Sequence, residues 1–300
     1  MKVIRITPRG FCPGVVRAIS LVNNAIQNPN LPRPIYILGM IVHNKQVVND
    51  FTSKGVITLD EPNRSKLDLL KQVQTGTIII TAHGTSEDVL KEIKSKGLTL
   101  VDATCKDVYK THDLIRQYLA KNYQILYIGK KHHPETVGVL GIDSSIISIE
   151  KTEDIDLLQL DSKLIFVTNQ TTLSVFDFEE IKQKLIDKFP FAFISEEICD
   201  STRIRQEAIV ETNKNVDLCF IVGDLRSNNS KNLARVSETI TNTKTILIET
   251  AHDIYHKLLK NDMIISVSSG ASTPTETTSQ VINYLEQFDE FNPLTWKIKN

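Results

Sequence analysis

Residues 3–27 read VIRITPRGFCPGVVRAISLVNNAIQ. The run VIRIT is rich in β-branched residues, as expected of a short strand, and ends just before the turn that holds Cys12. After Cys12, apolar residues recur at helical spacing, namely Val15, Ile19, Val22 and Ile26. Cys12 is therefore predicted to lie where a strand turns into a helix. Unpaired N–H groups at a helix start favour a thiolate there.

The same pattern occurs twice more. The β-rich run LTLVDAT precedes Cys105 and the helical run DVYKTHDLIRQYLAKN follows it. FAFISEEI precedes Cys199, and IRQEAIVETNKN follows it. The three cysteines are separated by 93 and 94 residues, so the spacing predicts an internal repeat.

Each repeat also places polar side chains after two further apolar runs. His43, His133 and Asn229 lie 31, 28 and 30 residues after their cysteines, and a later set consists of His83, Thr171 and Ser272. Alternating strands and helices predict parallel sheets, which bind ligands at the carboxyl ends of their strands. We expect an α/β fold of three tandem pseudo-equivalent units with parallel-rich sheets around a central cluster cleft.

The repeat also predicts domain limits. The first α/β unit spans 12–103 and the second spans 104–197. The third combines 1–11 with 198–290, and 291–300 forms a C-terminal tail.

Composition excludes several classes of protein. The 35 basic and 36 acidic side chains nearly cancel, so no overall positive field predicts nucleic-acid binding. No apolar run approaches the roughly 18 residues of a spanning helix, so we expect no membrane association and a cytoplasmic location. Four cysteines in 300 residues are too few for a disulfide scaffold, which favours metal binding.

Three thiolates suit either zinc or an iron–sulfur cluster, and the spacing alone leaves both open. The simplest alternative is that the cysteines are small buried hydrophobes, which we accept for Cys219 in the apolar run LCFIV. Three functions therefore compete: an iron–sulfur enzyme, a three-thiolate zinc hydrolase and a non-enzymatic iron–sulfur redox sensor.

Three of the histidines follow strands. His43, His83 and His133, with serine, threonine and asparagine side chains, can donate hydrogen bonds to phosphate oxygens, which predicts a diphosphate site. His112, His252 and His256 lie in polar helical stretches and receive no role. Glu135, two residues after His133, is a candidate proton donor.

An ordered set of motifs carries a resemblance to a known family. The motifs are PRGFCPGVVRAI at Cys12, VHN at His43, AHG at His83, DATC at Cys105, HPE at 133–135, NQTTLS at 169–174, IC and RQEA around Cys199, SNNS at 227–230 and GAST at 270–273. Nearly end to end, the chain resembles the 4-hydroxy-3-methylbut-2-enyl diphosphate reductases, the terminal enzymes of the methylerythritol phosphate isoprenoid pathway.

The resemblance implies an oxygen-sensitive [4Fe–4S] cluster held by Cys12, Cys105 and Cys199, whose open iron binds the substrate hydroxyl. It implies that Glu135 delivers the proton and that Thr171 orients this hydroxyl. Removal of the hydroxyl as water gives isopentenyl and dimethylallyl diphosphates, with electrons from a ferredoxin or flavodoxin. The implied substrate contacts are His43, His83, His133, Thr171, Ser227, Asn228, Asn229 and Ser272, and all of them except Thr171 lie in the implied diphosphate pocket.

The chain departs from the family pattern beside these positions. Lys106 stands where proline is usual, and DSTRIRQ follows Cys199 in place of YATTNRQ. Asn228 replaces a serine, while Asp224 and Arg226 add charges nearby. We expect diphosphate binding to survive, because an amide also donates hydrogen bonds to phosphate.

Overall fold

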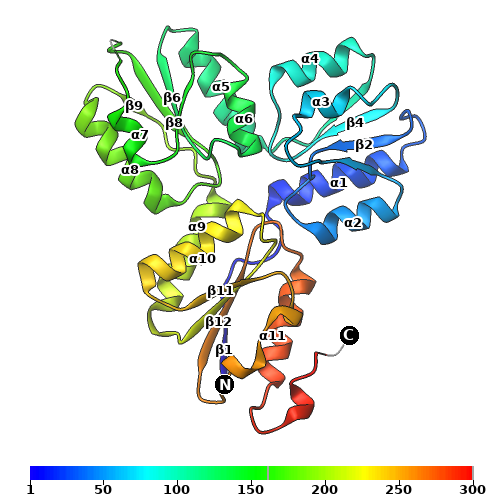
Figure 1. Cartoon of the computed structure of the whole chain (residues 1–300), viewed down its shortest axis with the longest axis vertical. Coiled ribbons are helices and arrows are strands. Elements are labelled where there is room, and N and C mark those ends of the chain that lie inside the picture. Colours follow the sequence, from blue (N-terminus) through cyan, green and yellow to red (C-terminus); the bar gives the residue numbers. More distant parts are fainter. Residues whose placement is uncertain (161, 299–300) are drawn as a thin grey trace. The chain divides into compact units, whose positions relative to one another are not determined.

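The computed structural model describes residues 1–160 and 162–298, which divide into two compact units. Unit 1 combines Met1–Cys12 with the chain from Cys199 onward, and unit 2 is Pro13–Ile198. The described residues form three sheets of four strands each, one in unit 1 and two in unit 2 (Figure 1). Every strand pairing within these sheets is parallel, which confirms the predicted α/β class.

Sheet A, in unit 1, has the strand order β1 (Lys2–Arg5), β12 (Ile264–Ser269), β10 (Leu218–Val222) and β11 (Thr245–Ile248). Sheet B, in unit 2, has the order β3 (Ile57–Leu59), β2 (Ile35–Leu38), β4 (Thr77–Ile80) and β5 (Thr99–Asp102). Sheet C, also in unit 2, has the order β7 (Ile147–Ile149), β6 (Gln124–Ile128), β8 (Ile165–Asn169) and β9 (Phe193–Ile194).

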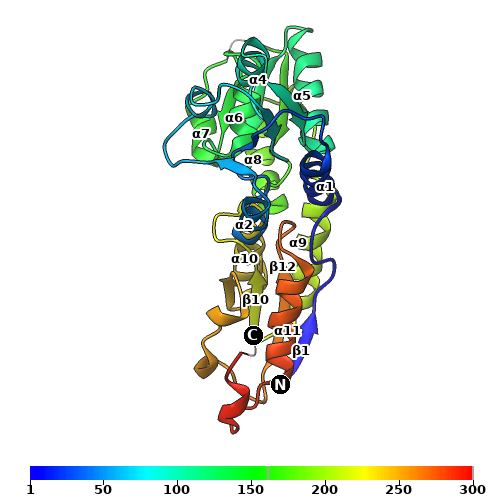
Figure 2. The same ribbon diagram turned by 90° about the vertical axis from the view of Figure 1, so that its right-hand side faces the viewer.

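The first strand of the chain completes the sheet of the C-terminal segment. Lys2 of β1 is in register with Ile264 of β12, and the two strands run side by side in both ribbon views (Figures 1 and 2). The residue limits of the three predicted units stay a prediction. Residues 299–300 of the predicted tail lie outside the described residues.

Helices connect the strands. In unit 2 they are α1 (Pro13–Gln27), α2 (Lys45–Ser53), α3 (Lys66–Leu70), α4 (Glu87–Ser95), α5 (Lys106–Leu119), α6 (Pro134–Leu140), α7 (Thr152–Asp156) and α8 (Val175–Lys188). In unit 1 they are α9 (Asp200–Thr212), α10 (Asn228–Thr241) and α11 (Thr275–Gln287). Short 3₁₀ turns lie at Asn213–Asn215, Ala251–Asp253, His256–Leu258 and Pro293–Thr295. The strand, turn and helix predicted around each of the three cysteines are confirmed.

Each sheet is covered by helices on both faces because successive strand residues point to opposite sides. In sheet A, Phe220 packs with Val281 and Leu285 of α11, whereas the adjacent Cys219 and Ile221 pack with residues of α9 and α10. In sheet C, α7 and α8 cover one face while α5 and α6 cover the other. In sheet B, Figure 1 shows α3 and α4 on one side and α1 and α2 on the other. The central strands β2, β4, β6, β8, β10 and β12 are therefore mostly buried, whereas edge strands such as β1 and β5 are partly exposed.

The buried stripe of α1 differs from the prediction. Val15 and Val22 are buried as expected, but Ala18 and Ala25 complete the stripe, while the bulkier Ile19 and Ile26 stay partly exposed. Alanine at the centre of the contact lets a helix backbone approach its neighbours more closely than isoleucine does.

The order of the strands places one topological switch point in each sheet. The chain leaves β2 toward β3 on one side and then continues to β4 and β5 on the other, so the switch lies between β2 and β4. The same order puts a switch between β6 and β8 and another between β10 and β12. Ligands of open α/β sheets bind at the carboxyl ends of such strand pairs.

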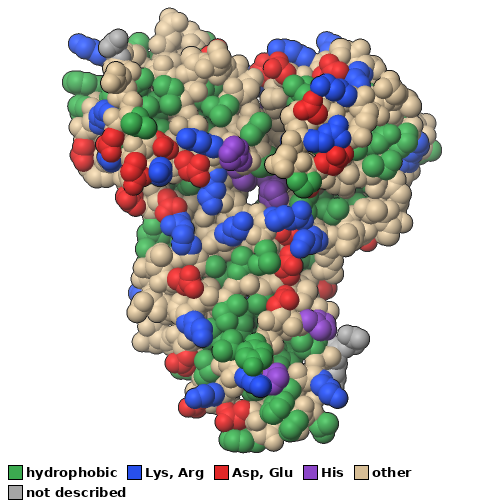
Figure 3. All heavy atoms as spheres, in the orientation of Figure 1, with side chains coloured by type: hydrophobic (Ala, Val, Ile, Leu, Met, Phe, Trp, Pro, Cys, Tyr) green, Lys and Arg blue, Asp and Glu red, His purple; other side chains and the backbone are tan. Residues whose placement is uncertain are grey.

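Within the described residues, no helix has both the length and the apolar character needed to cross a membrane. Figure 3 shows basic and acidic side chains interspersed over the face it displays, as the near-zero net charge predicts.

Candidate functional site

Two of the three predicted cluster cysteines are N-cap residues, and the third lies just before a helix. Cys105 caps α5 and Cys199 caps α9, while Cys12 directly precedes α1. All three are partly buried, whereas Cys219 is fully buried in β10, where burial raises the pKa of its thiol. Cys12 and Cys199 belong to unit 1, and Cys105 belongs to unit 2.

In unit 1, a buried arginine accompanies the two cysteines. Arg205 of α9 is 2% exposed, and it donates hydrogen bonds to the carbonyl oxygens of Pro8 (3.0 Å), Ser269 (3.1 Å) and Gly10 (2.7 Å). These bonds tie the loop before Cys12 to the end of β12.

The electrostatics of Arg205 fit an anionic group beside these cysteines. Burial lowers the pKa of its guanidinium, while the charges of Cys12 and Cys199 act in the opposite direction. Its Nε is buried without a hydrogen-bond partner among the described residues. Soft thiolate ligands beside a fixed buried cation suit a metal–sulfur group that carries net negative charge.

Unit 1 also presents unsatisfied amide groups at the switch point of sheet A. Asn228 and Asn229 open α10, each 7% exposed, and their side-chain nitrogens are buried with no partner among the described residues. Ser227 caps the helix by accepting a bond from the Ser230 N–H, and Ser272 follows β12 on the other side of the switch. Buried donors at a helix N-terminus are suited to binding an anion.

Close packing explains the glycines around these amides. A Cβ on Gly223 or Gly270 would lie 2.2 or 2.1 Å from the Ser230 Oγ, so only glycine fits beside this serine. The two added charges in this region pair with each other, since the Arg226 Nε lies 3.3 Å from the Asp224 carboxylate. The departures from the family pattern therefore bring little net charge to this end of α10.

In unit 2, three predicted histidines come together. His43 and His83 follow β2 and β4, and His133 is the N-cap of α6 after β6. Their ring centroids lie 4.5 Å (His43–His83), 5.5 Å (His83–His133) and 6.0 Å (His43–His133) apart. The switch points of sheets B and C thus contribute to one cluster, as the spacing predicted.

Two of the three histidine rings, those of His83 and His133, are held neutral. Burial, together with the charge of His43, lowers the pKa of His133 to about 3 and that of His83 well below its usual range. The Nδ1 of His133 accepts the Glu135 N–H at 3.3 Å, which leaves its Nε2 as the N–H donor. The neutral rings of His83 and His133 donate hydrogen bonds and bring no charge of their own.

Three imidazoles could also hold a metal. One ligand atom from each ring lies within 4.8 Å of the others, and three histidines are a familiar ligand set for catalytic zinc. The geometry of the rings alone suits either a metal ion or a phosphate group.

Beside the histidines, Glu135 lies 1% exposed in a network with Thr171. Its carboxylate accepts hydrogen bonds from the Thr171 N–H (2.7 Å), the Thr171 hydroxyl (3.1 Å) and the Tyr127 hydroxyl (3.3 Å). Burial raises the pKa of Glu135 to about 7, although these hydrogen bonds oppose the shift. A carboxyl with this pKa is poised to release a proton near neutral pH.

Sequence reasoning missed Tyr127 and Arg205 as site residues, and it missed the burial of His112. Tyr127 lies within the buried strand β6, and no local signal separates it from a core aromatic residue. Arg205 belongs to the quoted RQEA motif but received no role of its own. His112 lies in a polar helical stretch, yet the structure buries it to 5% exposure on the inner face of α5, where burial lowers its pKa to about 4.

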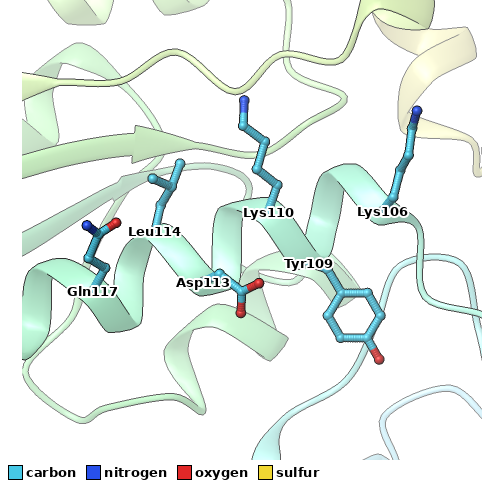
Figure 4. A pocket seen from close by; sticks show the side chains of 6 residues that line it. All are labelled: Lys106, Tyr109, Lys110, Asp113, Leu114 and Gln117. Atoms are coloured by element: carbon cyan, nitrogen blue, oxygen red, sulfur yellow. The ribbon is translucent and has the colours of Figure 1, made fainter.

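A separate hollow lies along one side of α5 and holds none of the predicted site residues (Figure 4). Its lining residues all belong to this helix: Lys106, Tyr109, Lys110, Asp113, Leu114 and Gln117. The Lys110 ammonium pairs with Glu197 at 2.9 Å, and the Tyr109 hydroxyl is bonded to Asp102. We assign this hollow no catalytic role, because a single helix supplies its whole lining and none of the predicted site residues is among the lining residues.

The sequence matches the model of the LytB protein family over residues 3–286. It is 50% identical to the 4-hydroxy-3-methylbut-2-enyl diphosphate reductase of Anoxybacillus flavithermus over 298 residues, which cover 99% of this chain and 94% of that protein. It is also 50% identical to the reductase of the same name from Brevibacillus brevis, with coverage of 100% and 96%.

Solved structures agree with these matches. The E-1-hydroxy-2-methyl-but-2-enyl-4-diphosphate reductase of Plasmodium falciparum superposes with a TM-score of 0.89 at 33% identity, covering 100% of this chain and 91% of that one. A second structure, described as the terminal enzyme of the non-mevalonate pathway, gives a TM-score of 0.66 at 28% identity, with coverage of 96% and 100%.

Proposed function

The chain belongs to the LytB family, and from this premise we propose that it reduces 4-hydroxy-3-methylbut-2-enyl diphosphate to isopentenyl and dimethylallyl diphosphates. The reaction takes up two electrons and two protons and releases the substrate hydroxyl as water. One observation carries the proposal within this chain: the Glu135 carboxyl, with a pKa of about 7, lies buried against Thr171 and beside the three clustered histidines.

LytB-family membership implies an iron–sulfur enzyme. We assign a [4Fe–4S] cluster to Cys12, Cys105 and Cys199, and the buried Arg205 charge beside the first and third cysteines supports this assignment. When bound, the cluster supplies electrons one at a time and an iron open to a substrate oxygen. We further propose a cytoplasmic ferredoxin or flavodoxin as the electron donor.

The diphosphate contacts are assigned by the family motifs. In unit 2 they are His43, His83 and His133, and the neutral rings of His83 and His133 donate hydrogen bonds. In unit 1 they are Ser227, Asn228, Asn229 and Ser272, and the unpartnered amides at the start of α10 support this part of the assignment.

We assign proton delivery to Glu135 and the orientation of the substrate hydroxyl to Thr171. The protonated Glu135 is the acid that delivers a proton toward the reacting centre, and the Thr171 hydroxyl orients the substrate hydroxyl. Because Thr171 bonds Glu135 through both its backbone N–H and its hydroxyl, the two side chains hold a fixed relative position. Burial keeps bulk water from exchanging freely with this proton.

The decisive experiment begins with anaerobic purification and analysis of iron, sulfide and zinc. We expect iron and sulfide in equal amounts, and oxidation of a reduced viologen dye when the hydroxy-diphosphate is added. Zinc without iron would indicate a hydrolase instead, whether the thiols or the histidines hold the ion. An intact cluster that never oxidises the dye would indicate a redox sensor. Either result would refute the proposed reaction.

A further inference from the structure

A lysine that no family motif assigns reaches the carboxyl end of sheet B. Lys66 is the first residue of α3, a short helix capped by the Ser65 side chain. Its Cε lies 3.7 Å from the point where a Cβ on Gly39 would stand, directly after β2. Its Nζ donates a hydrogen bond of 2.8 Å to the carbonyl oxygen of Gly84, the residue after His83. The ammonium therefore lies over the ends of β2 and β4.

The charge of Lys66 affects the pKa values of two histidines in the cluster. It contributes to lowering the pKa of both His83 and His133, and Lys130 acts in the same direction on His133. Burial lowers the pKa of Lys66, and the charges of Asp60 and Asp102, at the ends of the neighbouring strands β3 and β5, oppose that shift. Asp102 is already engaged by the Tyr109 hydroxyl and the Thr104 N–H. Among the described residues, Lys66 forms no direct ion pair with a carboxylate.

Lys66 changes its protonation state close to neutral pH. Burial lowers the pKa of Lys66 to about 8, although Asp60 and Asp102 partly oppose the shift. The ammonium is therefore largely charged at pH 7 and largely neutral at pH 9. A half-buried cation without a carboxylate partner is costly to a fold, and a bound anion would offset that cost.

We propose that the Lys66 ammonium is an additional ligand of the substrate diphosphate and supplies positive charge that the neutral rings of His83 and His133 lack. This inference rests on the proposed function, because it takes the histidine cluster as the diphosphate site. One of the three ammonium protons bonds Gly84, which leaves two for phosphate oxygens. The same cation disfavours a divalent metal ion at the histidine cluster, because like charges repel. Its charge therefore favours a phosphate group over a metal ion as the ligand of these rings.

A purely structural role is the alternative, since the bond to Gly84 also fixes the turn that carries His83. Gly84 has a φ of +75°, in the left-handed region, and such a turn benefits from an anchor. The two roles predict different effects of charge. An anchor matters equally at pH 7 and pH 9, whereas a phosphate ligand loses its effect when its proton leaves.

The test is calorimetric titration of inorganic diphosphate into the full chain with its reconstituted cluster, under anaerobic conditions. Lys66→Met should weaken binding roughly 10- to 100-fold at pH 7, the scale of a hydrogen bond to a charged group. Lys66→Arg should restore most of the affinity. Lys71→Met is the matched control, because Lys71 caps the same helix on the surface and pairs only with Asp68. It should bind like the parent.

The pH dependence separates the two roles. The affinity of the parent should fall between pH 7 and pH 9 through a step that Lys66→Met lacks. Unchanged affinity in Lys66→Met would overturn the inference. So would weaker binding with the pH step retained, because that result assigns Lys66 to anchoring the turn. Failure of the parent itself to bind diphosphate would instead refute the proposed function, so the two failures are distinguishable.

Discussion

The pH dependence of turnover follows from the Glu135 carboxyl. Burial raises its pKa to about 7, while the bonds from Thr171 and Tyr127 keep it from rising further. With that pKa, about half of the molecules carry the proton at pH 7, about a tenth at pH 8 and about a hundredth at pH 9. If the protonated form is the catalytic acid, turnover falls about fivefold from pH 7 to 8 and about tenfold over the next unit.

Two substitutions change this profile in different ways. Glu135→Gln keeps the shape of the side chain but removes the transferable proton, so turnover should drop by roughly 10²–10⁴ and lose its decline between pH 7 and 9. Thr171→Val removes the 3.1 Å bond from the hydroxyl to the carboxylate and leaves the backbone bond. Because that bond favours the charged form, its loss should move the decline upward by about one pH unit, besides lowering turnover.

The assay is steady-state oxidation of reduced viologen by the hydroxy-diphosphate from pH 6.5 to 9.5, with iron content measured for each variant. Glu153→Gln is the control, since Glu153 is an exposed carboxylate of α7. It should follow the parent profile. Turnover of Glu135→Gln at the parent level with a full cluster would remove Glu135 from the mechanism. If turnover of Thr171→Val falls over the same pH range as that of the parent, a group other than Glu135 controls the fall.

Three further predictions concern cluster retention, acid stability and packing. Arg205→Met should lower the iron and sulfide retained after gel filtration more than Arg205→Lys does, because only lysine keeps a cation beside the two cysteines of unit 1; equal retention would contradict this. Burial lowers the pKa of His112 to about 4, so its neutral ring stabilises the fold above pH 6.5 and this contribution is lost as the pH falls, by about 2 kcal/mol at pH 5. His112→Gln should therefore lose less stability than the parent between pH 8 and pH 5 in urea unfolding, and an equal loss would refute this. Gly76→Ala should cost roughly 2–5 kcal/mol, because its φ is +116° and its Cβ would lie 2.3 Å from the Pro34 carbonyl oxygen. Gly55→Ala, with a φ of +82° and open space around it, should cost only about 1–2 kcal/mol, and equal midpoints in urea would show that the contact with Pro34 is relieved elsewhere.

Local sequence was enough for the elements that carry the site. A β-rich run, a cysteine and a helical period recur three times, and all three places have the expected strand, turn and helix. The buried stripe of α1 was harder to predict, because isoleucine and alanine are both apolar and periodicity does not say which of two adjacent stripes faces the sheet. His112 shows the same limit, since one face of a polar helix is buried by neighbours that are distant in sequence.

The sequence by itself determined the α/β class, the parallel sheets and the types of side chain at the strand ends, because these depend on local propensity and on period. Only the tertiary structure decided how those side chains act. The charge state of His133, the pKa of Glu135 and the position of the Lys66 ammonium over β2 and β4 all depend on burial and on neighbours that are far away in the chain. A pKa reflects the dielectric and the charges around a group, and chain folding alone brings those together.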